Sequence, residues 1–225
     1  TRPPDRVRQD VSRSPGGDSR VFLNNCVACH AGMDPLAQAF AYYDYDATAG
    51  RIVHQLLQRN GLDADAMYLE CGLDPLKLDD PRARYPLERT CALWRLAHER
   101  IHDPCWGLAA GEVWRPTDFH ALGCAFLASR TLESALLRLE RYFRIVVQDV
   151  ALRVTTDRDS GSMTITYAPP SEDADIPTLQ DACWSVILRM CRDAYGPDLP
   201  LREVQLTHPW QACGRYSLLG GGTMA

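Results

Sequence analysis

The chain has 225 residues, of which 46% are hydrophobic and 24% are charged, and its formal net charge is −5. These values are ordinary for one large globular domain, or for one domain with an appendage. The acidic balance supplies no basic surface for nucleic acid, and no apolar run approaches the roughly 18 residues of a membrane-spanning helix. We therefore expect neither a membrane-spanning segment nor a basic surface that binds nucleic acid.

The first part of the chain carries one sharp motif. Residues 1–20 are polar, contain Pro and Gly and show no apolar period, which predicts a flexible arm. CVACH follows at residues 26–30 and has the form C-x-x-C-H, the attachment signature of c-type haem. Cys26 and Cys29 would bind the haem vinyl groups, and His30 would be an axial ligand of the iron. The alternatives are a zinc site, which needs a second ligand pair, a redox dithiol, and a chance match.

The residues after CVACH favour the haem interpretation. In them a Met-Asp-Pro is followed by an apolar stretch with an aromatic residue and by an Asp-rich turn that ends in Gly-Arg. Residues 1–51 thereby resemble the C-terminal haem-c segment of planctomycete-type cytochrome proteins. The resemblance implies covalent haem c and a location outside the cytoplasmic membrane, and it supplies no second axial ligand. It is carried by Cys26, Cys29, His30, Met33, Asp34, Pro35, Phe40, Asp44, Asp46, Gly50 and Arg51.

The pattern becomes helical from His54 onward. Asn60-Gly61 is typical of a helix end, and Asp63 is predicted to be the N-cap of the next helix. Two longer helices are predicted within residues 86–101 and 131–147, because each has one apolar face with spacings of three and four. The residues of these faces are Leu87, Cys91, Trp94, Ala97 and Ile101, and then Leu132, Leu136, Leu139, Phe143 and Val146.

The apolar period then changes to two. Two alternating stretches flank the turn DRDSG, which predicts an antiparallel hairpin near residues 150–167. A long helix is predicted from Thr178 to Gly196, and LREVQLTHP is predicted as a third strand. The fold class is therefore α+β, a helix-rich domain with a small antiparallel sheet, preceded by a short irregular or helical C-x-x-C-H segment. We place the domain boundaries at 1–51, 52–210 and a tail of 211–225.

A second resemblance covers most of the chain. Residues 53–210 resemble the N-terminal ligand-sensing domain of AraC-type transcriptional regulators, of the arabinose-binding type. The resemblance implies a cytoplasmic, non-enzymatic sensor that binds a small organic effector, with self-association as a further expectation. The matching stretches are LLQRNGLDADAMYLECGLD, the helix start at Asp79-Asp80-Pro81, Leu93-Trp94, DPCWGLAAGEVWRPTDFHALGCAFLASRTLESALLRLERYFRIV and GPDLPLREVQLTHP.

The end of the chain departs from that family. The family continues into a helix-turn-helix domain, whereas this sequence runs into QACGRYSLLGGGTMA and stops. We therefore expect a truncated sensor and no DNA binding by this chain. The haem segment and the sensor imply different compartments, so we interpret the sequence as a fusion of two unrelated parts that join near residue 51.

A ligand pocket is predicted in VWRPTDFHALG, which places Trp114, Arg115, Phe119 and His120 between two apolar helices. A concave apolar site with a few polar groups has this composition. The alternative is that Trp114 and Phe119 belong to the core and that Arg115 caps a helix end.

Two further patterns bear on function. HERIH, residues 98–102, matches the zinc-peptidase motif H-E-x-x-H, in which His98 and His102 would bind zinc and Glu99 would be the general base. No third ligand is placed, so we expect no catalytic zinc and no enzyme. The chain also has nine cysteines, and the seven outside CVACH are scattered singly. That scatter predicts reduced thiols and a cytoplasmic protein. A haem-c electron-transfer module and a zinc peptidase remain the alternative functions.

Overall fold

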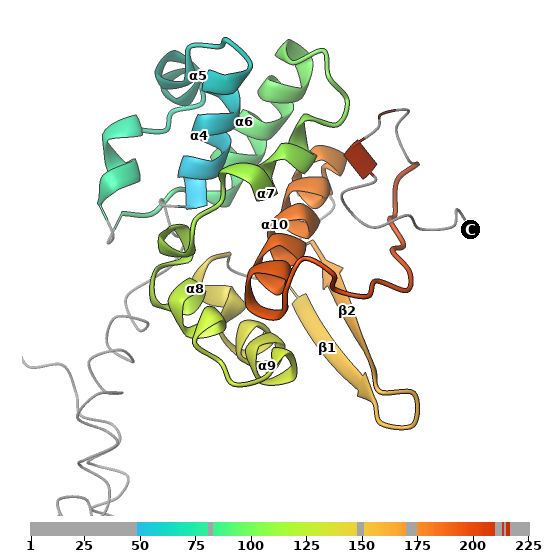
Figure 1. Ribbon diagram of the computed structural model, residues 1–225. Coiled ribbons are helices and arrows are strands. Elements are labelled where there is room, and N and C mark those ends of the chain that lie inside the picture. The colour runs from blue at the N-terminus through green and yellow to red at the C-terminus, as the bar shows by residue number, and fades with distance from the viewer. Residues whose placement is uncertain are drawn as a thin grey trace, which may run out of the picture. The chain divides into compact units, whose positions relative to one another are not determined.

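A computed structural model describes residues 49–80, 83–147, 151–169, 175–209, 213, 215 and 216. In this part of the chain a helix-rich domain carries one two-stranded antiparallel sheet, so the α+β class predicted from the sequence is confirmed. The longest helix, α10 (Pro177–Tyr195), runs through the middle of the domain (Figure 1). None of the described helices is long and apolar enough to cross a membrane. The haem motif lies outside the described residues.

The first helices form where the sequence places caps. Helix α4 (Gly50–Arg59) ends at Asn60, whose side-chain amide donates to the Leu56 carbonyl at 2.8 Å, and Gly61 follows with a φ of 74°. The Asp63 carboxylate then accepts from the Ala66 backbone amide at 3.0 Å and starts α5 (Ala64–Glu70). Both predicted helix signals are thereby confirmed. A short 3-10 helix, η3 (Pro75–Asp79), leads toward α6.

Helices α6 (Leu87–Arg100) and α9 (Leu132–Tyr142) bury the faces that their periodicity predicts. Thr131 and Ser134 form a reciprocal capping box at the start of α9. On α6, Trp94 stacks on Trp106 with ring centroids 4.8 Å apart. Between these helices lie η4 (Trp106–Ala109), α7 (Ala110–Val113), η5 (Pro116–Phe119) and α8 (His120–Leu127), and η6 (Phe143–Ile145) follows α9.

Glycines let the segment η4–α7 pack directly on α10. A Cβ at Gly107 would lie 2.1 Å from the Thr178 carbonyl oxygen, and one at Gly111 would lie 2.6 Å from that of Ser185. The Gly111 amide also donates to the Ser185 hydroxyl at 3.1 Å. Helix α10 is consequently buried on several sides. Its buried residues are Thr178, Gln180, Asp181, Ala182, Ser185, Val186, Ile187, Leu188, Met190 and Cys191.

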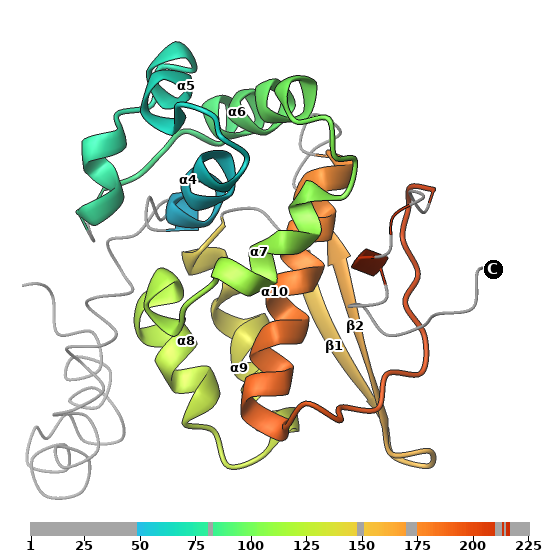
Figure 2. The same ribbon diagram turned by 45° about the horizontal axis from the view of Figure 1, so that its top comes forward.

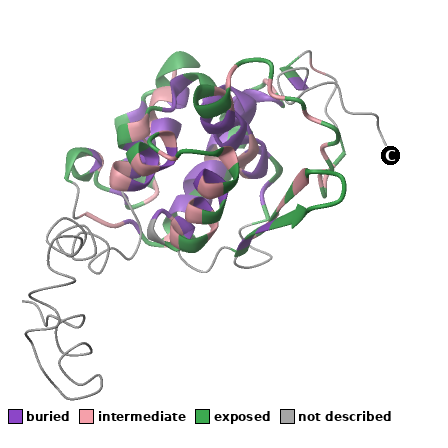
Figure 3. Cartoon of the chain, turned by 60° about the horizontal axis from the view of Figure 1, so that its bottom comes forward, coloured by how far each residue is buried: buried purple, intermediate pink, exposed green. Residues whose placement is uncertain are grey.

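The predicted hairpin is confirmed as β1 (Ala151–Asp157) and β2 (Ser162–Ala168), which pair in antiparallel register with Val154 opposite Ile165. The Asp157 carboxylate accepts from the Asp159 amide and the Ser160 hydroxyl in the connecting turn. The hairpin extends beside α10 with its tip exposed (Figures 2 and 3). Tyr167 on β2 makes an edge contact with the Trp184 ring of α10, with centroids 6.3 Å apart.

The prediction of a third strand is wrong. Residues 201–206 have no strand partner within the described sheet, which contains β1 and β2 alone. The side chains of Leu201, Val204 and Leu206 instead join a small apolar cluster on η4 and α10. It comprises Cys105, Leu108, Leu188 and Tyr216, with Trp184, Leu199, Leu201, Val204, Leu206 and Cys213 packed against them. Alternating apolar residues predict burial of one face, but they do not show whether that face belongs to a sheet or to an extended segment on a helix.

The expectation that the cysteines outside CVACH are all reduced is also wrong. Cys105 and Cys213 form a disulfide across a sequence separation of 108 residues. Pairing at such a distance leaves no local spacing signal in the sequence. Among the other described cysteines, Cys71, Cys124, Cys183 and Cys191 are free thiols. Cys213 belongs to the stretch predicted as a tail, and this stretch therefore has a covalent link to the domain.

Candidate ligand pocket between α6 and α10

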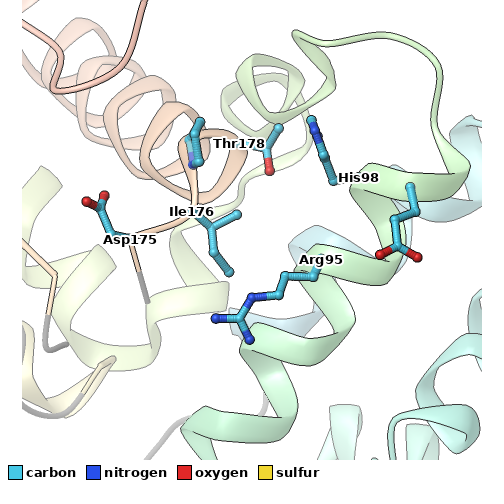
Figure 4. Close-up of a pocket in the computed structure, with 7 residues that line it drawn as sticks. Arg95, His98, Asp175, Ile176 and Thr178 are labelled. Carbon is cyan, nitrogen blue, oxygen red and sulfur yellow. The ribbon is translucent and has the colours of Figure 1, made fainter. Parts of the chain in front are cut away.

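A pocket of about 300 Å³ opens where the last turns of α6 face the start of α10 (Figure 4). Helix α6 contributes Arg95, His98 and Glu99, whose side chains are exposed. The approach to α10 and its first turn contribute the remaining lining residues, which are Asp175, Ile176, Pro177 and Thr178. The pocket thus combines two basic side chains, two carboxylates, the apolar Ile176 and Pro177, and the Thr178 hydroxyl.

Thr178 is the polar residue at the bottom of this pocket. It is 2% exposed, and its hydroxyl oxygen is buried without a hydrogen-bond partner. Figure 4 shows the hydroxyl directed into the space between α6 and the start of α10. Leaving a buried hydroxyl without a partner costs about 1–3 kcal/mol. A ligand atom in the pocket would remove that cost.

The start of α10 adds a second polar feature to the pocket. Pro177 has no backbone N–H, and the Leu179 and Gln180 amides donate to the Ile176 carbonyl at 3.0 Å. The Thr178 amide is therefore the donor of this turn that a ligand could use. The amino end of a helix carries a partial positive charge and attracts anions. In α10 this end faces the same pocket as the Thr178 hydroxyl.

The carboxylates of the pocket differ in their surroundings. Asp175 accepts a hydrogen bond from the Gln180 side-chain amide, and the Gln180 carbonyl oxygen accepts one from the Thr207 hydroxyl at 3.0 Å. The pocket is in this way connected to the extended segment that follows α10. Glu99 lies on the opposite wall, on α6. The site can therefore accept an anionic group at the start of α10 and a neutral or cationic group near its edge.

A second cavity, of about 490 Å³, lies at the connection between α8 and α9. Four of its polar side chains are already paired within the protein. Arg138 donates to the Ala125 carbonyl at 2.7 Å and to the Ser129 hydroxyl at 2.8 Å, and Thr131 and Ser134 cap α9. We therefore regard the pocket between α6 and α10 as the better candidate.

Residues 61–219 match the family described as the arabinose-binding domain of AraC transcription regulators, at their N-terminus. The chain belongs to this family. A comparison with curated proteins gives no match. The match confirms the AraC-type resemblance predicted for residues 53–210, and it continues into the stretch predicted as a tail. It does not bear on the haem-c resemblance of residues 1–51.

The residues predicted as the ligand site lie elsewhere in this AraC-type domain. Trp114 and Phe119 are buried in the main core, where their rings make an edge contact with centroids 6.0 Å apart. The exposed Arg115 uses its backbone amide to donate to the Asp118 carboxylate at 2.8 Å at the start of η5. None of these residues, nor His120, lines either of the two cavities. Their role in ligand binding stays a prediction.

His120 is the described non-glycine residue with a positive φ, at 47°. A side chain in this region of φ is uncommon and costs about 1–3 kcal/mol, so the surrounding structure must hold it there. The residue joins η5 to α8, and Gly123 on the next turn packs against the Pro116 backbone. The sharp reversal at His120 therefore follows from the close contact between η5 and α8.

The HERIH motif divides between the pocket and a loop. His98 and Glu99 lie on the pocket wall, whereas His102 follows the end of α6 at Arg100. In the described part of the chain no three side chains of His, Cys, Asp or Glu gather as a metal site would require. His98 and Glu99 thus belong to the lining of the candidate site.

Sequence reasoning missed Arg95, Ile176 and Thr178 as site residues. One local signal was present, because Pro177 opens a long helix whose preceding residue, Ile176, cannot cap it. A long helix without a side-chain cap is a candidate for capping by a ligand. The facing residues on α6 could not be assigned from this signal, because they are more than 70 positions away in the sequence.

Proposed function

We propose that this chain is the effector-sensing domain of an AraC-type transcriptional regulator and that it acts in the cytoplasm without catalysis. The observation that carries the proposal is the family match over residues 61–219. The pocket between α6 and α10 supports it, because its volume of about 300 Å³ suits a small organic molecule. We propose this pocket as the effector site.

The position of the pocket suggests how occupancy reaches the rest of a regulator. Gln180 bridges Asp175 in the pocket to Thr207 in the segment after α10. One turn along α10 from Thr178, the Asp181 carboxylate accepts from the Tyr216 hydroxyl at 3.0 Å. A ligand that moves the start of α10 would act on both contacts. We propose that the segment from Leu199 to Tyr216 transmits ligand binding toward whatever follows the sensor.

Thermal unfolding of the purified chain with a panel of small sugars, amino acids and organic acids tests the sensing function. A compound at a hundred times its dissociation constant stabilises the native state by about 2.7 kcal/mol. For a domain of this size we expect the melting temperature to rise by about 5–10 °C. If no compound of the panel raised the melting temperature, the effector-sensing role would be contradicted.

We also propose a haem-c electron-transfer role for the first part of the chain, conditional on export. The C-x-x-C-H motif of Cys26, Cys29 and His30 favours it. These residues lie outside the described part of the chain, so the proposal rests on sequence alone. When bound, haem would supply one-electron redox chemistry.

A further inference from the structure

We infer that the pocket between α6 and α10 binds a small organic carboxylate, with the carboxylate held against the Thr178 hydroxyl, the Arg95 side chain and the amino end of α10. The inference rests on the proposed sensing function and names the chemical class of its effector. It is carried by the arrangement of these three groups around one pocket (Figure 4).

The Thr178 hydroxyl indicates that the pocket takes a polar ligand atom. A buried hydroxyl is ordinarily paired with a protein group or with a bound molecule. Thr178 is 2% exposed, and no described protein atom accepts from or donates to its oxygen. Since this oxygen faces the pocket, a molecule bound there can serve as its partner.

The amino end of α10 indicates that the ligand atom carries negative charge. The helix has 19 residues, and no side chain caps its first turn. A carboxylate oxygen placed there accepts hydrogen bonds and interacts favourably with the partial positive charge of the helix end. Thr178 lies in this same first turn, so one carboxylate can reach the hydroxyl and the helix end together.

The basic residues come from the facing helix α6. Arg95 and His98 lie three positions apart on one face and line the pocket opposite Thr178. A guanidinium group binds a carboxylate through two parallel hydrogen bonds, which gives orientation as well as charge. The His98 ring provides a further N–H donor on the same wall.

The other lining residues restrict the rest of the ligand. The carboxylates of Asp175 and Glu99 oppose any anionic group, and the Arg95 charge can offset one such group but not two, so dicarboxylates and phosphates are disfavoured. Ile176 and Pro177 offer an apolar surface for a hydrocarbon remainder. An amino group on the ligand would be attracted by the Asp175 or Glu99 carboxylate. A zwitterionic amino acid offers the same carboxylate as a simple monocarboxylic acid, and the test therefore compares the two.

Calorimetric titration of the full chain at neutral pH tests the inference. The probes are butyrate, hexanoate and benzoate as monocarboxylates, norvaline as the zwitterion, and succinate as the dicarboxylate. Butyramide and L-arabinose are the neutral compounds. We expect saturable binding of at least one monocarboxylate or of norvaline, and binding of succinate and butyramide weaker by about tenfold or more.

Two substitutions with matched controls locate the site. Thr178→Val removes the hydroxyl at constant shape, and Arg95→Gln removes the charge of an exposed side chain. Each is expected to weaken carboxylate binding by about tenfold or more, because each removes a hydrogen bond to a charged group. The controls Thr117→Val and Arg130→Gln change exposed residues away from the pocket and are expected to bind as the wild type does. Circular dichroism and the melting temperature report whether each variant is folded.

Several outcomes would overturn the inference. These are failure of every carboxylate to bind, equal binding of butyrate and butyramide, or unchanged carboxylate affinity in both folded pocket variants. Tight binding of L-arabinose with no carboxylate binding would overturn this inference while supporting the sensing function. The failure of one proposal can therefore be distinguished from the failure of the other.

Discussion

Gly107 holds the floor of the candidate pocket in place by lacking a side chain. Its backbone lies so close to α10 that a Cβ would stand 2.1 Å from the carbonyl oxygen of Thr178. No flexible side chain can move away there, because the contact is with backbone. The position of Thr178 in the pocket therefore depends on a residue from a distant part of the sequence.

We predict that Gly107→Ala destabilises the domain and weakens ligand binding together. Forcing a methyl group into a packed contact typically lowers the free energy of unfolding by about 1–3 kcal/mol. Because the contact at Gly107 is with backbone, we expect a loss at the upper end of this range or above it. Urea denaturation measures the loss of stability, and titration with the best ligand measures affinity. Gly161→Ala in the hairpin turn is the control. Its φ of 64° disfavours alanine, but a Cβ there meets nothing within 4 Å. A Gly107→Ala protein as stable as the control variant would show that η4 can move away from α10.

The CVACH motif gives a second prediction at the residue scale. We expect protein made in the cytosol to be free of haem, and export with haem-c maturation machinery to give at most partial loading. Thioether formation needs both thiols reduced, an accessible segment and the right compartment, and about fifty residues are too few to enclose a haem alone. A denaturing gel stained for haem peroxidase activity compares the wild type with Cys26→Ala and Cys29→Ala. A strong, cysteine-dependent band from cytosolic protein would contradict the prediction.

The described residues 199–209, 213, 215 and 216, which we call the strap, pack on η4 and α10. Its far end is held by the disulfide between Cys213 and Cys105 and by an ion pair between Arg215 and Asp103 at 2.7 Å. Tyr216 donates to the Asp181 carboxylate of α10 at 3.0 Å. The strap therefore contacts the same helix whose amino end forms the pocket.

We predict that Cys213→Ser lowers the free energy of unfolding by about 2–4 kcal/mol, because the disulfide closes a long loop and limits the unfolded chain. The disulfide spans 108 positions, so the model of unfolded-chain entropy places the effect in the upper part of this range or above it. Urea denaturation with and without a reductant measures it. Cys124→Ser replaces an exposed free thiol and serves as the control. If the reductant left the wild-type midpoint unchanged, the strap would not depend on this bond.

His208 places a titratable ring of the strap beside a carboxylate of α10. Its ring nitrogen Nε2 lies 3.3 Å from the Asp181 carboxylate, and its Nδ1 lies 3.1 Å from the Pro209 carbonyl oxygen. The Asp181 carboxylate raises the pKa of His208 above its ordinary value of 6.5, with smaller contributions from Pro209 and Asp175, while burial opposes the rise. The protonated ring is thus favoured in the folded protein.

A raised pKa in the folded state stabilises the protein at low pH. The contribution is fully present below the unfolded value of 6.5, and it is lost as the pH rises through the higher folded value. We therefore predict that the stability advantage of the wild type over His208→Gln is larger at pH 6 than at pH 8. Urea denaturation of both proteins across this interval measures it, and His102→Gln, at an exposed loop position, is the control. An advantage that grew with pH would show that the ring is bound in its neutral form.

The sequence predicted the elements whose signals are local and missed those that depend on distant contacts. The buried face of α9 was predicted, because Leu136 and Leu139 repeat at helical spacing. The hairpin was predicted, because alternation and a turn stand side by side. The Cys105–Cys213 disulfide and the packing of the strap were missed, since both join residues far apart in sequence. The unpaired Thr178 hydroxyl is likewise a property of the folded surroundings and has no pattern in the sequence.

At the scale of the whole molecule, the chain divides between Tyr43 and Asp44, and residues 44–225 form a unit of their own. The predicted boundary between residues 51 and 52 falls inside helix α4, which begins at Gly50. The Tyr68 hydroxyl donates to the Gly50 carbonyl at 2.6 Å, so the start of α4 is hydrogen-bonded to α5 within this unit. The main core of the described residues draws its buried members from Ile52 to Cys191.

We predict that a fragment of residues 44–225 unfolds in urea with the midpoint of the full chain and binds the same ligand, because it retains this core, the pocket and the strap. A fragment that starts at Gly61, where the family match begins, is the informative control. It loses α4 and with it Val53, Leu56 and Leu57, which are buried in the core. Burying each such side chain contributes about 1.5–3 kcal/mol, and the total approaches the 5–15 kcal/mol that stabilises a typical domain. The shorter fragment should therefore lack a cooperative transition. If the longer fragment were destabilised instead, residues 1–43 would contribute to the fold of the sensor, and the two parts of the chain would not be independent.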